Sequence, residues 1–323
     1  MKARTLWMTE PGRIEVRDVE VGAPGHGELQ VRMNICGICA WDSYLFRGKS
    51  LVDDFPFRFG HEGVGVIVAV GPGVSDLNEG DNVFCAGGAP SMAEVINMPR
   101  TSVTPIPADI EDYSLWIGEP VACVVNSLDL LSERPGDHVV VVGSGYMGLL
   151  HIQGLARMTV GRITAFDIDE KRLALARQFG ADEALLIGSG EADRAIERIK
   201  SEGGADVTIE CSSVQSGLDL SAQLLRRGGL MSLFAWHRGE RTIDGTLWHV
   251  NGLRMVNSSP ASDPHFSERL PQTARLIERG VFDQRELITH VRPFTEAQRM
   301  MEIATNKEDG YIKGAISFGG GER

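Results

Sequence analysis

The sequence has no apolar run of about 18 residues, the length that a membrane-spanning helix requires. Its first residues, MKARTLWMTEPG, contain no apolar stretch of the kind that forms a secretory signal. Positively charged residues are also fewer than negatively charged ones. The chain has 32 Lys and Arg and 44 Asp and Glu, for a formal net charge of −12. Phosphate backbones bind to basic surfaces. We therefore expect a cytoplasmic protein that binds neither a membrane nor a nucleic acid.

Cysteine is scarce, with five residues scattered along 323 positions. They are Cys36, Cys39, Cys85, Cys123 and Cys211. An odd, dispersed set without a secretory signal is typical of a reducing compartment and argues against a disulfide framework. Glycine, in contrast, is abundant at 38 residues, and it is needed where the backbone has a positive φ or approaches another segment closely. A chain of this length and composition predicts a turn-rich enzyme of two domains.

The hydrophobic pattern divides the chain into three regions. Up to about residue 130, β-branched runs such as GELQVRMNI and GVGVIVAVG predict mostly β-strands. From residue 121 to 261, apolar strands alternate with helical segments, which predicts a doubly wound parallel sheet. The tail contains two helical and two strand-like segments. We expect this tail to join the head, so that residues 1–120 and 262–323 form one discontinuous domain around a nucleotide-binding domain of residues 121–261.

A glycine-rich turn lies near the start of the middle region. In VVVVGSGYMG, Gly143, Gly145 and Gly148 form a Gly-x-Gly-x-x-Gly pattern between an apolar strand and a helix that opens at Tyr146 and Met147. The first Gly permits a tight turn, the second lets the backbone approach a pyrophosphate, and the third lets helix and strand pack closely. The N-terminus of the helix also attracts the anion. This placement predicts a dinucleotide site formed by these five residues.

The next strand, RITAFD, ends in Asp167. A carboxylate at this place accepts hydrogen bonds from ribose hydroxyls and repels a 2′-phosphate, so we expect NAD in preference to NADP. The alternative is that Asp167 only caps the helix that follows. Arg172, five residues later, either flanks the ribose or lies on a solvated helix face.

Two segments contain side chains that bind metals. The segment NICGICAWDSYLFRG contains Cys36 and Cys39. Such a pair is either half of a zinc knuckle, a redox couple, or one metal ligand next to a cysteine that binds no metal. RFGHEG places His61 next to Glu62, and adjacent side chains in a strand point to opposite sides, so only one is expected to face a site. With Glu119 downstream, Cys39 and His61 supply the sulfur, nitrogen and oxygen ligands that Zn²⁺ accepts. Three protein ligands and an open fourth position are typical of catalytic zinc.

The order of the motifs indicates a family. CGICAWD, GHEGVGVIVAVG, EPVAC, VVVVGSGYMG and LITHVRPF follow one another along essentially the whole chain. The chain resembles the zinc-dependent medium-chain alcohol dehydrogenases, and within them the polyol and threonine dehydrogenases, in which Glu-Pro supplies the third metal ligand. The resemblance implies an α/β fold with a GroES-like, β-rich catalytic domain and a doubly wound Rossmann domain.

The resemblance also implies roles for individual residues. Cys39, His61 and Glu119 would hold Zn²⁺. Glu62 would be a neighbour that approaches the metal when water or substrate exchanges. Asp42 would orient His61 from behind.

The sequence departs from the family pattern in two places. Cys85 stands alone where relatives carry four closely spaced cysteines for a structural zinc, so one zinc per chain is expected, and Cys36 would be a packing residue. Trp41 replaces the Thr or Ser whose hydroxyl starts the proton relay, and Tyr44 stands where some relatives have the His that ends it. An indole offers only an N–H donor, so Tyr44, Glu62, water or substrate hydroxyls would take over the relay. Trp41 is then either a wall of the substrate pocket or a core aromatic.

Together these implications describe one chemistry. Zn²⁺ would lower the pKa of a bound alcohol, and a hydride would pass from the carbinol carbon to the nicotinamide of NAD. The Glu-Pro pattern suggests by analogy a small-molecule substrate with a secondary alcohol, namely a polyol, sugar or sugar derivative. We also expect a homodimer or homotetramer. The alternatives are a zinc-free NAD(P)H reductase of the same superfamily, threonine dehydrogenase itself, and an inactive nucleotide-binding relative.

Overall fold

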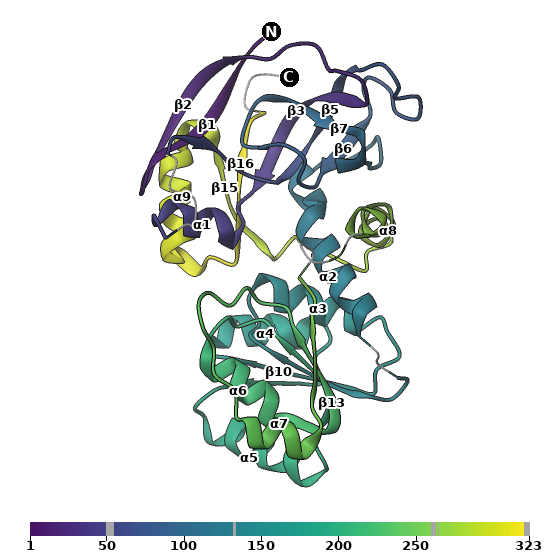
Figure 1. Ribbon diagram of the computed structural model, residues 1–323, viewed down its shortest axis with the longest axis vertical. Coiled ribbons are helices and arrows are strands. Elements are labelled where there is room, and N and C mark those ends of the chain that lie inside the picture. The colour runs from purple at the N-terminus through teal and green to yellow at the C-terminus, as the bar shows by residue number, and fades with distance from the viewer. Residues whose placement is uncertain (50–54, 132–133, 260–262, 264, 320–323) are drawn as a thin grey trace. The chain divides into compact units, whose positions relative to one another are not determined.

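The computed structural model describes residues 1–49, 55–131, 134–259, 263 and 265–319. The chain divides into two compact units, one of Met1–Ala122 with Ser267–Arg323 and one of Cys123–Phe266. Each unit has its own sheets and its own apolar core (Figure 1). Within the described residues, none of the helices is long and apolar enough to cross a membrane.

The first unit is built mainly from antiparallel strands. They are β1 (Lys2–Glu10), β2 (Arg13–Glu20), β3 (Glu28–Gly37), β4 (Phe57–Arg58), β5 (Glu62–Val70), β6 (Asn82–Cys85), β7 (Val95–Pro99), β8 (Val103–Pro105), β15 (Ile288–Pro293) and β16 (Lys313–Ser317). One sheet has the order β2-β1-β4, and a larger one follows the path β15-β16-β3-β5-β6-β8, with β7 also paired to β3. The tail joins the head at β16, which runs antiparallel to β3 with Ile316 opposite Cys36.

Helices cover the ends of this unit. They are α1 (Ala40–Phe46), α2 (Gly118–Leu130), α8 (Phe266–Glu278) and α9 (Ala297–Asn306), with 3-10 turns at Arg100–Ser102, Tyr113–Trp116, Phe294–Glu296 and Glu308–Gly310. The division between the two units falls within α2. Met300 of α9 and Met33 of β3 belong to one buried apolar cluster, so the tail contributes to the same core as the head.

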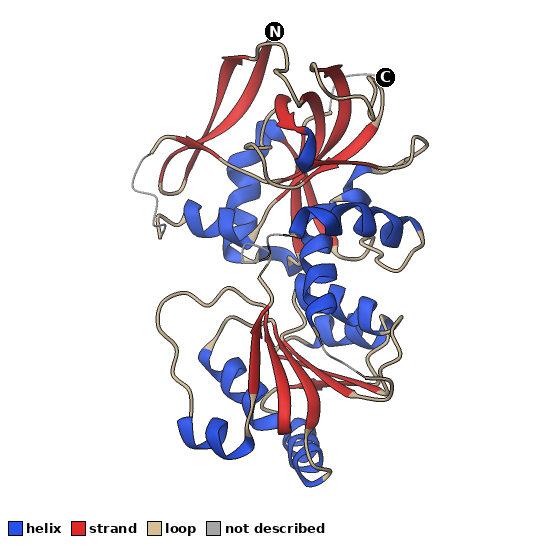
Figure 2. Ribbon diagram, turned by 45° about the vertical axis from the view of Figure 1, so that its right-hand side comes forward, coloured by secondary structure: helices blue, strands red, loops and turns tan. Residues whose placement is uncertain are grey.

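The second unit is a doubly wound parallel sheet with helices on both faces (Figure 2). Its strands are β9 (His138–Val142), β10 (Arg162–Asp167), β11 (Glu183–Leu186), β12 (Ala205–Glu210), β13 (Leu225–Leu233) and β14 (Arg254–Asn257), and its helices are α3 (Tyr146–Leu155), α4 (Glu170–Gln178), α5 (Gly190–Ser201), α6 (Gln215–Leu224) and α7 (Gly245–Asn251). The strand order is β11-β10-β9-β12-β13-β14. The order reverses at β9 and β12, and sheets of this type bind ligands at the carboxyl ends of the strands at that point. The predicted Rossmann fold is confirmed.

The structure corrects the predicted elements at the far edge of this sheet. The helical pattern of residues 216–229 predicts a longer helix, but α6 ends at Leu224 and β13 begins at the next residue. Backbone pairing of β13 with β12 on one side and β14 on the other holds this stretch in the sheet, and the Arg226 guanidinium also contacts Asp206 of β12 at 2.6 Å. The sequence pattern also misses α7 and β14, because both are largely exposed and lack the apolar periodicity on which such predictions rest.

Candidate metal and nucleotide sites

The glycine-rich turn joins β9 to α3 and requires glycine at two positions. Gly143 has φ +98°, and a Cβ there would lie 2.8 Å from the backbone nitrogen of Ser212. A Cβ on Gly148 would lie 1.9 Å from the carbonyl oxygen of Gly143, so glycine is what lets α3 pack so closely on the turn. A Cβ on Gly145 would meet nothing within 4 Å. A helix N-terminus with open space in front of it is suited to an anion.

Asp167, at the end of β10, is buried and holds the glycine turn in place. Its carboxylate accepts hydrogen bonds from the backbone N–H groups of Ser144 at 2.6 Å, Ile168 at 2.8 Å and Asp169 at 2.9 Å. Asp169, not Asp167, is the residue that caps the N-terminus of α4. The guanidinium of Arg172 lies 3.9 Å from the Asp167 carboxylate, on the side of α4.

Tyr146 and Met147 form the first turn of α3. The Tyr146 side chain is buried, and the Met147 carbonyl accepts a hydrogen bond from Nδ1 of His151 at 2.8 Å. The first N–H groups of a helix have no partner within the helix. The contribution of these two residues to a nucleotide site would therefore come from their backbone.

Three of the four predicted metal ligands, namely Cys39, His61 and Glu62, lie together in the first unit. Cys39 immediately precedes α1, and His61 immediately precedes β5, whose first residue is Glu62. The ligand atoms of Cys39, His61 and Glu62 lie within 4.8 Å of one another. The expectation that His61 and Glu62 face opposite sides is wrong. The alternation of a strand does not apply to them, because His61 lies outside β5 and follows Gly60, whose φ is +86°.

Charges gather around the imidazole of His61. Burial acts to lower the pKa of His61, but its hydrogen bond with Cys39 and the charge of Glu119 outweigh burial and raise the pKa well above its usual value. Glu119 lies in the first turn of α2, so its carboxylate acts electrostatically on the site. Its role as a metal ligand stays a prediction. A protonated His61 would release its proton on metal binding, because only the neutral imidazole is a ligand.

Asp42 holds Cys39 in position. Its side chain is fully buried, and Oδ2 accepts the backbone N–H of Cys39 at 2.8 Å. Burial raises the pKa of Asp42, and the charge of His61 opposes that rise. The interaction of Asp42 with His61 is thus electrostatic, whereas its hydrogen bond is accepted from Cys39. The predicted orienting of His61 by Asp42 stays a prediction.

Two other cysteines of the first unit, Cys36 and Cys85, are buried. Cys36 lies in the apolar core of the first unit, and burial raises the pKa of its thiol well above the usual value. Burial also raises the pKa of the Cys85 thiol to about 12. Such thiols are poor ligands because the thiolate is the form that binds metals. Among the residues that the structure describes, Cys39, His61 and Glu62 are the one group of three suitable side chains.

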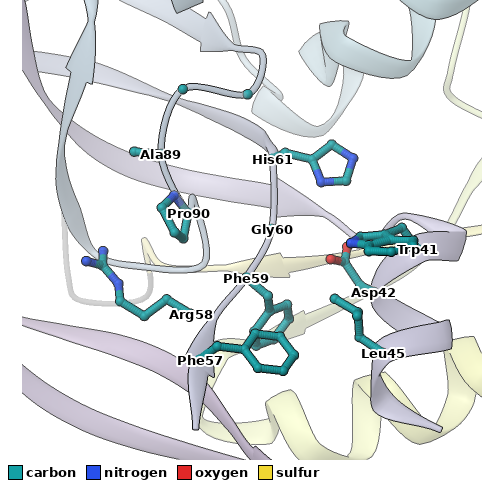
Figure 3. A pocket seen from close by; sticks show the side chains of 12 residues that line it. Trp41, Asp42, Leu45, Phe57, Arg58, Phe59, Gly60, His61, Ala89 and Pro90 are labelled. Carbon is teal, nitrogen blue, oxygen red and sulfur yellow. The ribbon is translucent and has the colours of Figure 1, made fainter. Parts of the chain in front are cut away.

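A pocket of about 350 Å³ lies beside this cluster (Figure 3). Its wall is formed by Trp41, Asp42 and Leu45 of α1 and by residues 57–61 and 87–90. Trp41 lines the pocket and also packs against the apolar core, so it is both a wall and a core aromatic. The ring of Tyr44, on the same helix, lies 6.2 Å from the Trp41 ring between centroids.

Comparison with known proteins identifies the family. Residues 25–108 match the model of the alcohol dehydrogenase GroES-like domain, and residues 147–279 match that of the zinc-binding dehydrogenases. Over 294 residues the chain is 30% identical to an alcohol dehydrogenase of Moraxella sp., which covers 81% of this chain and 85% of that protein. The chain belongs to the zinc-dependent medium-chain alcohol dehydrogenase family.

Solved structures with the same architecture as this dehydrogenase include two from Escherichia coli. L-idonate 5-dehydrogenase has a TM-score of 0.88 at 18% identity and covers 98% of this chain and 99% of its own. Galactitol-1-phosphate dehydrogenase has a TM-score of 0.86 at 21% identity and covers 97% and 99%. These likenesses confirm the predicted combination of a GroES-like domain with a Rossmann domain, and family membership makes the chain an oxidoreductase.

One charged residue at the site of this dehydrogenase, Lys313, lies outside all of the sequence motifs that predict the site. Lys313 of β16 places Nζ 2.7 Å from Oε1 and 2.5 Å from Oε2 of Glu62, and both side chains are buried. A lysine within the apolar terminal segment YIKGAISF is the signal that could have found it, since a buried lysine needs a partner. The ion pair holds the Glu62 carboxylate beside Cys39 and His61. Whether Glu62 approaches the metal stays a prediction.

Proposed function

We propose that this dehydrogenase transfers a hydride between NAD and a secondary alcohol of a polyol, sugar or sugar derivative. The observation that carries the proposal is the convergence of Cys39, His61 and Glu62 within 4.8 Å, beside an open pocket. Sulfur, nitrogen and oxygen donors in this arrangement fit Zn²⁺. Cys39, His61 and Glu119 would hold the ion, with the pocket left for the substrate.

The chain's own residues prepare the site for this chemistry. When bound, Zn²⁺ would supply Lewis-acid stabilisation of the alkoxide form of the alcohol. Asp42 accepts the backbone N–H of Cys39 and so positions the Cys39 sulfur, and the Lys313 ion pair holds the Glu62 carboxylate in place. Because the Trp41 indole has no exchangeable hydroxyl, the alcohol proton would leave through another group, such as Glu62, Tyr44, water or a substrate hydroxyl.

Asp167 supports the choice of NAD. Three backbone N–H groups use part of its acceptor capacity, and a carboxylate has about four lone-pair sites, so one remains for a ribose hydroxyl. A 2′-phosphate at the same place would meet a buried negative charge. The cation of Arg172 lies close to that carboxylate and is partly neutralised by it. The names of the two similar structures, for L-idonate and galactitol 1-phosphate, support a sugar derivative as substrate.

Metal analysis and a substrate screen test this proposal together. We expect about one zinc per chain and the formation of NADH with at least one polyol or sugar derivative. Nucleotide binding with neither zinc nor turnover would instead indicate the inactive relative, and reduction of a carbonyl by NAD(P)H without zinc would indicate the zinc-free reductase. The homodimer or homotetramer expected from the family resemblance is checked on the same preparation by light scattering.

A further inference from the structure

The pocket beside the metal ligands contains one more charged residue. Trp41, Asp42 and His61 form its wall on the side of the proposed metal, while Arg58 contributes to the wall near residues 87–90. In Figure 3 the Arg58 guanidinium lies beside Pro90, on the opposite side of the view from Trp41 and His61. The α-carbons of Arg58 and His61 are three residues apart and therefore lie at most about 10 Å from each other. Both residues line the same pocket, so one small molecule bound there can contact both.

Arg58 is a cation in an apolar setting. It pairs with Trp7 across β4 and β1, and it lies between Phe57 and Phe59, which pack with the apolar core. Its Nε is buried without a hydrogen-bond partner within the part of the chain that the structure describes. Burial lowers the pKa of Arg58, and no charged group contributes to the shift. An arginine nevertheless stays protonated at neutral pH.

Other arginines of the same unit are neutralised. The guanidinium of Arg4 contacts Glu94 at 2.5 Å, and that of Arg100 contacts Asp76 at 2.6 Å. Partial burial of a guanidinium without such a partner costs free energy, because water is lost and nothing replaces it. An oxyanion would replace the lost water with charge-assisted, bidentate hydrogen bonds, for which the planar guanidinium is suited.

We propose that the pocket takes a polyol or sugar derivative that carries a terminal oxyanion, and that Arg58 binds this anion while the reacting hydroxyl lies at the Cys39 and His61 end. This proposal rests on the function proposed above and narrows its substrate class. A volume of about 350 Å³ suits a small ligand of this size. The oxyanion is either a phosphate or a carboxylate, since the guanidinium recognises both.

A binding experiment tests the anion site without turnover. Inorganic phosphate and acetate are titrated separately into the zinc-loaded protein, and binding is measured by calorimetry. We expect one of the two to bind, and we expect Arg58→Met to weaken that binding at least tenfold while Arg58→Lys, which keeps the charge, retains part of it. Arg13→Met is the matched control, because Arg13 is an exposed residue of β2 that pairs with Glu10 and Glu15. It should bind the anion as the wild type does.

Matched substrate pairs then test the substrate class. The pairs are galactitol with galactitol 1-phosphate and L-iditol with L-idonate. Oxidation of each compound is measured by the formation of NADH. We expect the wild type to favour the anionic member of one pair at least tenfold in kcat/KM. Arg58→Met should remove that preference through KM while its zinc content stays at the wild-type level, and Arg13→Met should keep the preference.

The outcomes separate this inference from the proposed function. The role of Arg58 is overturned if the wild type has equal kcat/KM for the neutral and the anionic substrate of each pair. It is also overturned if Arg58→Met lowers kcat/KM equally for both substrates. Either result leaves the dehydrogenase function standing. Anion binding that depends on Arg58 without oxidation of any alcohol supports the site and contradicts the function. Binding of neither anion, or binding that is the same in Arg58→Met, overturns the anion site.

Discussion

Asp167 connects the glycine turn with the choice of nucleotide. Its carboxylate is oriented by three backbone N–H groups, so a ligand meets an acceptor that is already in place. The same contacts mean that removing the side chain also loosens the turn, since the N–H of Ser144 would lose its partner. A test of cofactor choice therefore has to remove the charge and keep an acceptor.

Asp167→Asn makes that change. The wild type should prefer NAD over NADP at least about tenfold in kcat/KM, or roughly 1.4 kcal/mol. The amide keeps an oxygen for the turn but no longer repels a 2′-phosphate, so the preference should narrow. Asp167→Ala should narrow it too, with an added loss of thermal stability. Equal use of both nucleotides by the wild type would contradict the assignment.

Among elements, α3 depends most on its glycines. Gly148→Ala would place a Cβ 1.9 Å from the Gly143 carbonyl oxygen, so the helix has to move away from the turn. We therefore expect a loss of about 1–3 kcal/mol in unfolding free energy.

Gly145→Ala is the matched variant in the same turn. Its Cβ would have no described atom within 4 Å, and φ at this position is −69°, so stability should be unchanged. NAD should nevertheless bind more weakly to Gly145→Ala. Thermal melts measure the stability of Gly148→Ala and Gly145→Ala, and calorimetric titration measures their affinity for NAD. Unimpaired binding of NAD by Gly145→Ala would show that the open space at Gly145 is not the pyrophosphate site.

The stability of the protein depends on pH through His151 of α3. Burial lowers the pKa of His151 to about 4, while its hydrogen bond to the Met147 carbonyl opposes the shift. In the unfolded chain the pKa is about 6.5, so below that pH the unfolded chain binds a proton that the folded chain does not. Stability is therefore lost as pH falls from about 6.5 to about 4, at roughly 1.4 kcal/mol per unit.

The variant His151→Gln lacks this titration. Between pH 7 and pH 5 the wild type should lose about 2 kcal/mol more unfolding free energy than the variant does, as measured by urea denaturation at each pH. Parallel losses in the two proteins would show that His151 is not the titrating group.

The elements that sequence patterns predicted well are those with a buried face. The run of valines in β9 is fully buried and reads as a strand, and the glycines of the turn are required by a positive φ and a close contact. The predicted helix over residues 216–229 fails because β13 pairs with both β12 and β14, and this pairing outweighs local helix preference. The contact between Lys313 and Glu62 joins residues 251 apart in sequence, which no local pattern shows.

At the scale of the molecule, that ion pair joins the tail to the head within the first unit. Lys313→Met leaves the Glu62 carboxylate buried without its cation, which typically costs about 3–5 kcal/mol. Adding Glu62→Gln removes the unpaired charge, so the double variant should recover much of that loss. Urea denaturation of the three proteins measures the effect. A single variant as stable as the wild type would mean that the pair does not hold the tail strand in place.

The two cysteines of the Cys-x-x-Cys segment have different surroundings, one at the proposed metal site and the other in the core. Cys39 is grouped with His61 and Glu62, whereas Cys36 is buried among apolar side chains. A hydroxyl is a far poorer zinc ligand than a thiolate. Because changes outside the ligand set already cost about 10–100-fold, Cys39→Ser should lose most of its zinc and at least about 100-fold in turnover. It should still bind NAD.

Elemental analysis of the wild type, Cys39→Ser and Cys36→Ser is the most direct test. The wild type should contain about one zinc per chain, Cys39→Ser little, and Cys36→Ser nearly the wild-type amount, with a stability cost of about 1–3 kcal/mol for its buried hydroxyl. Loss of the metal from Cys36→Ser with retention in Cys39→Ser would contradict the account, and equal loss from both would mean that the two cysteines form one joint site.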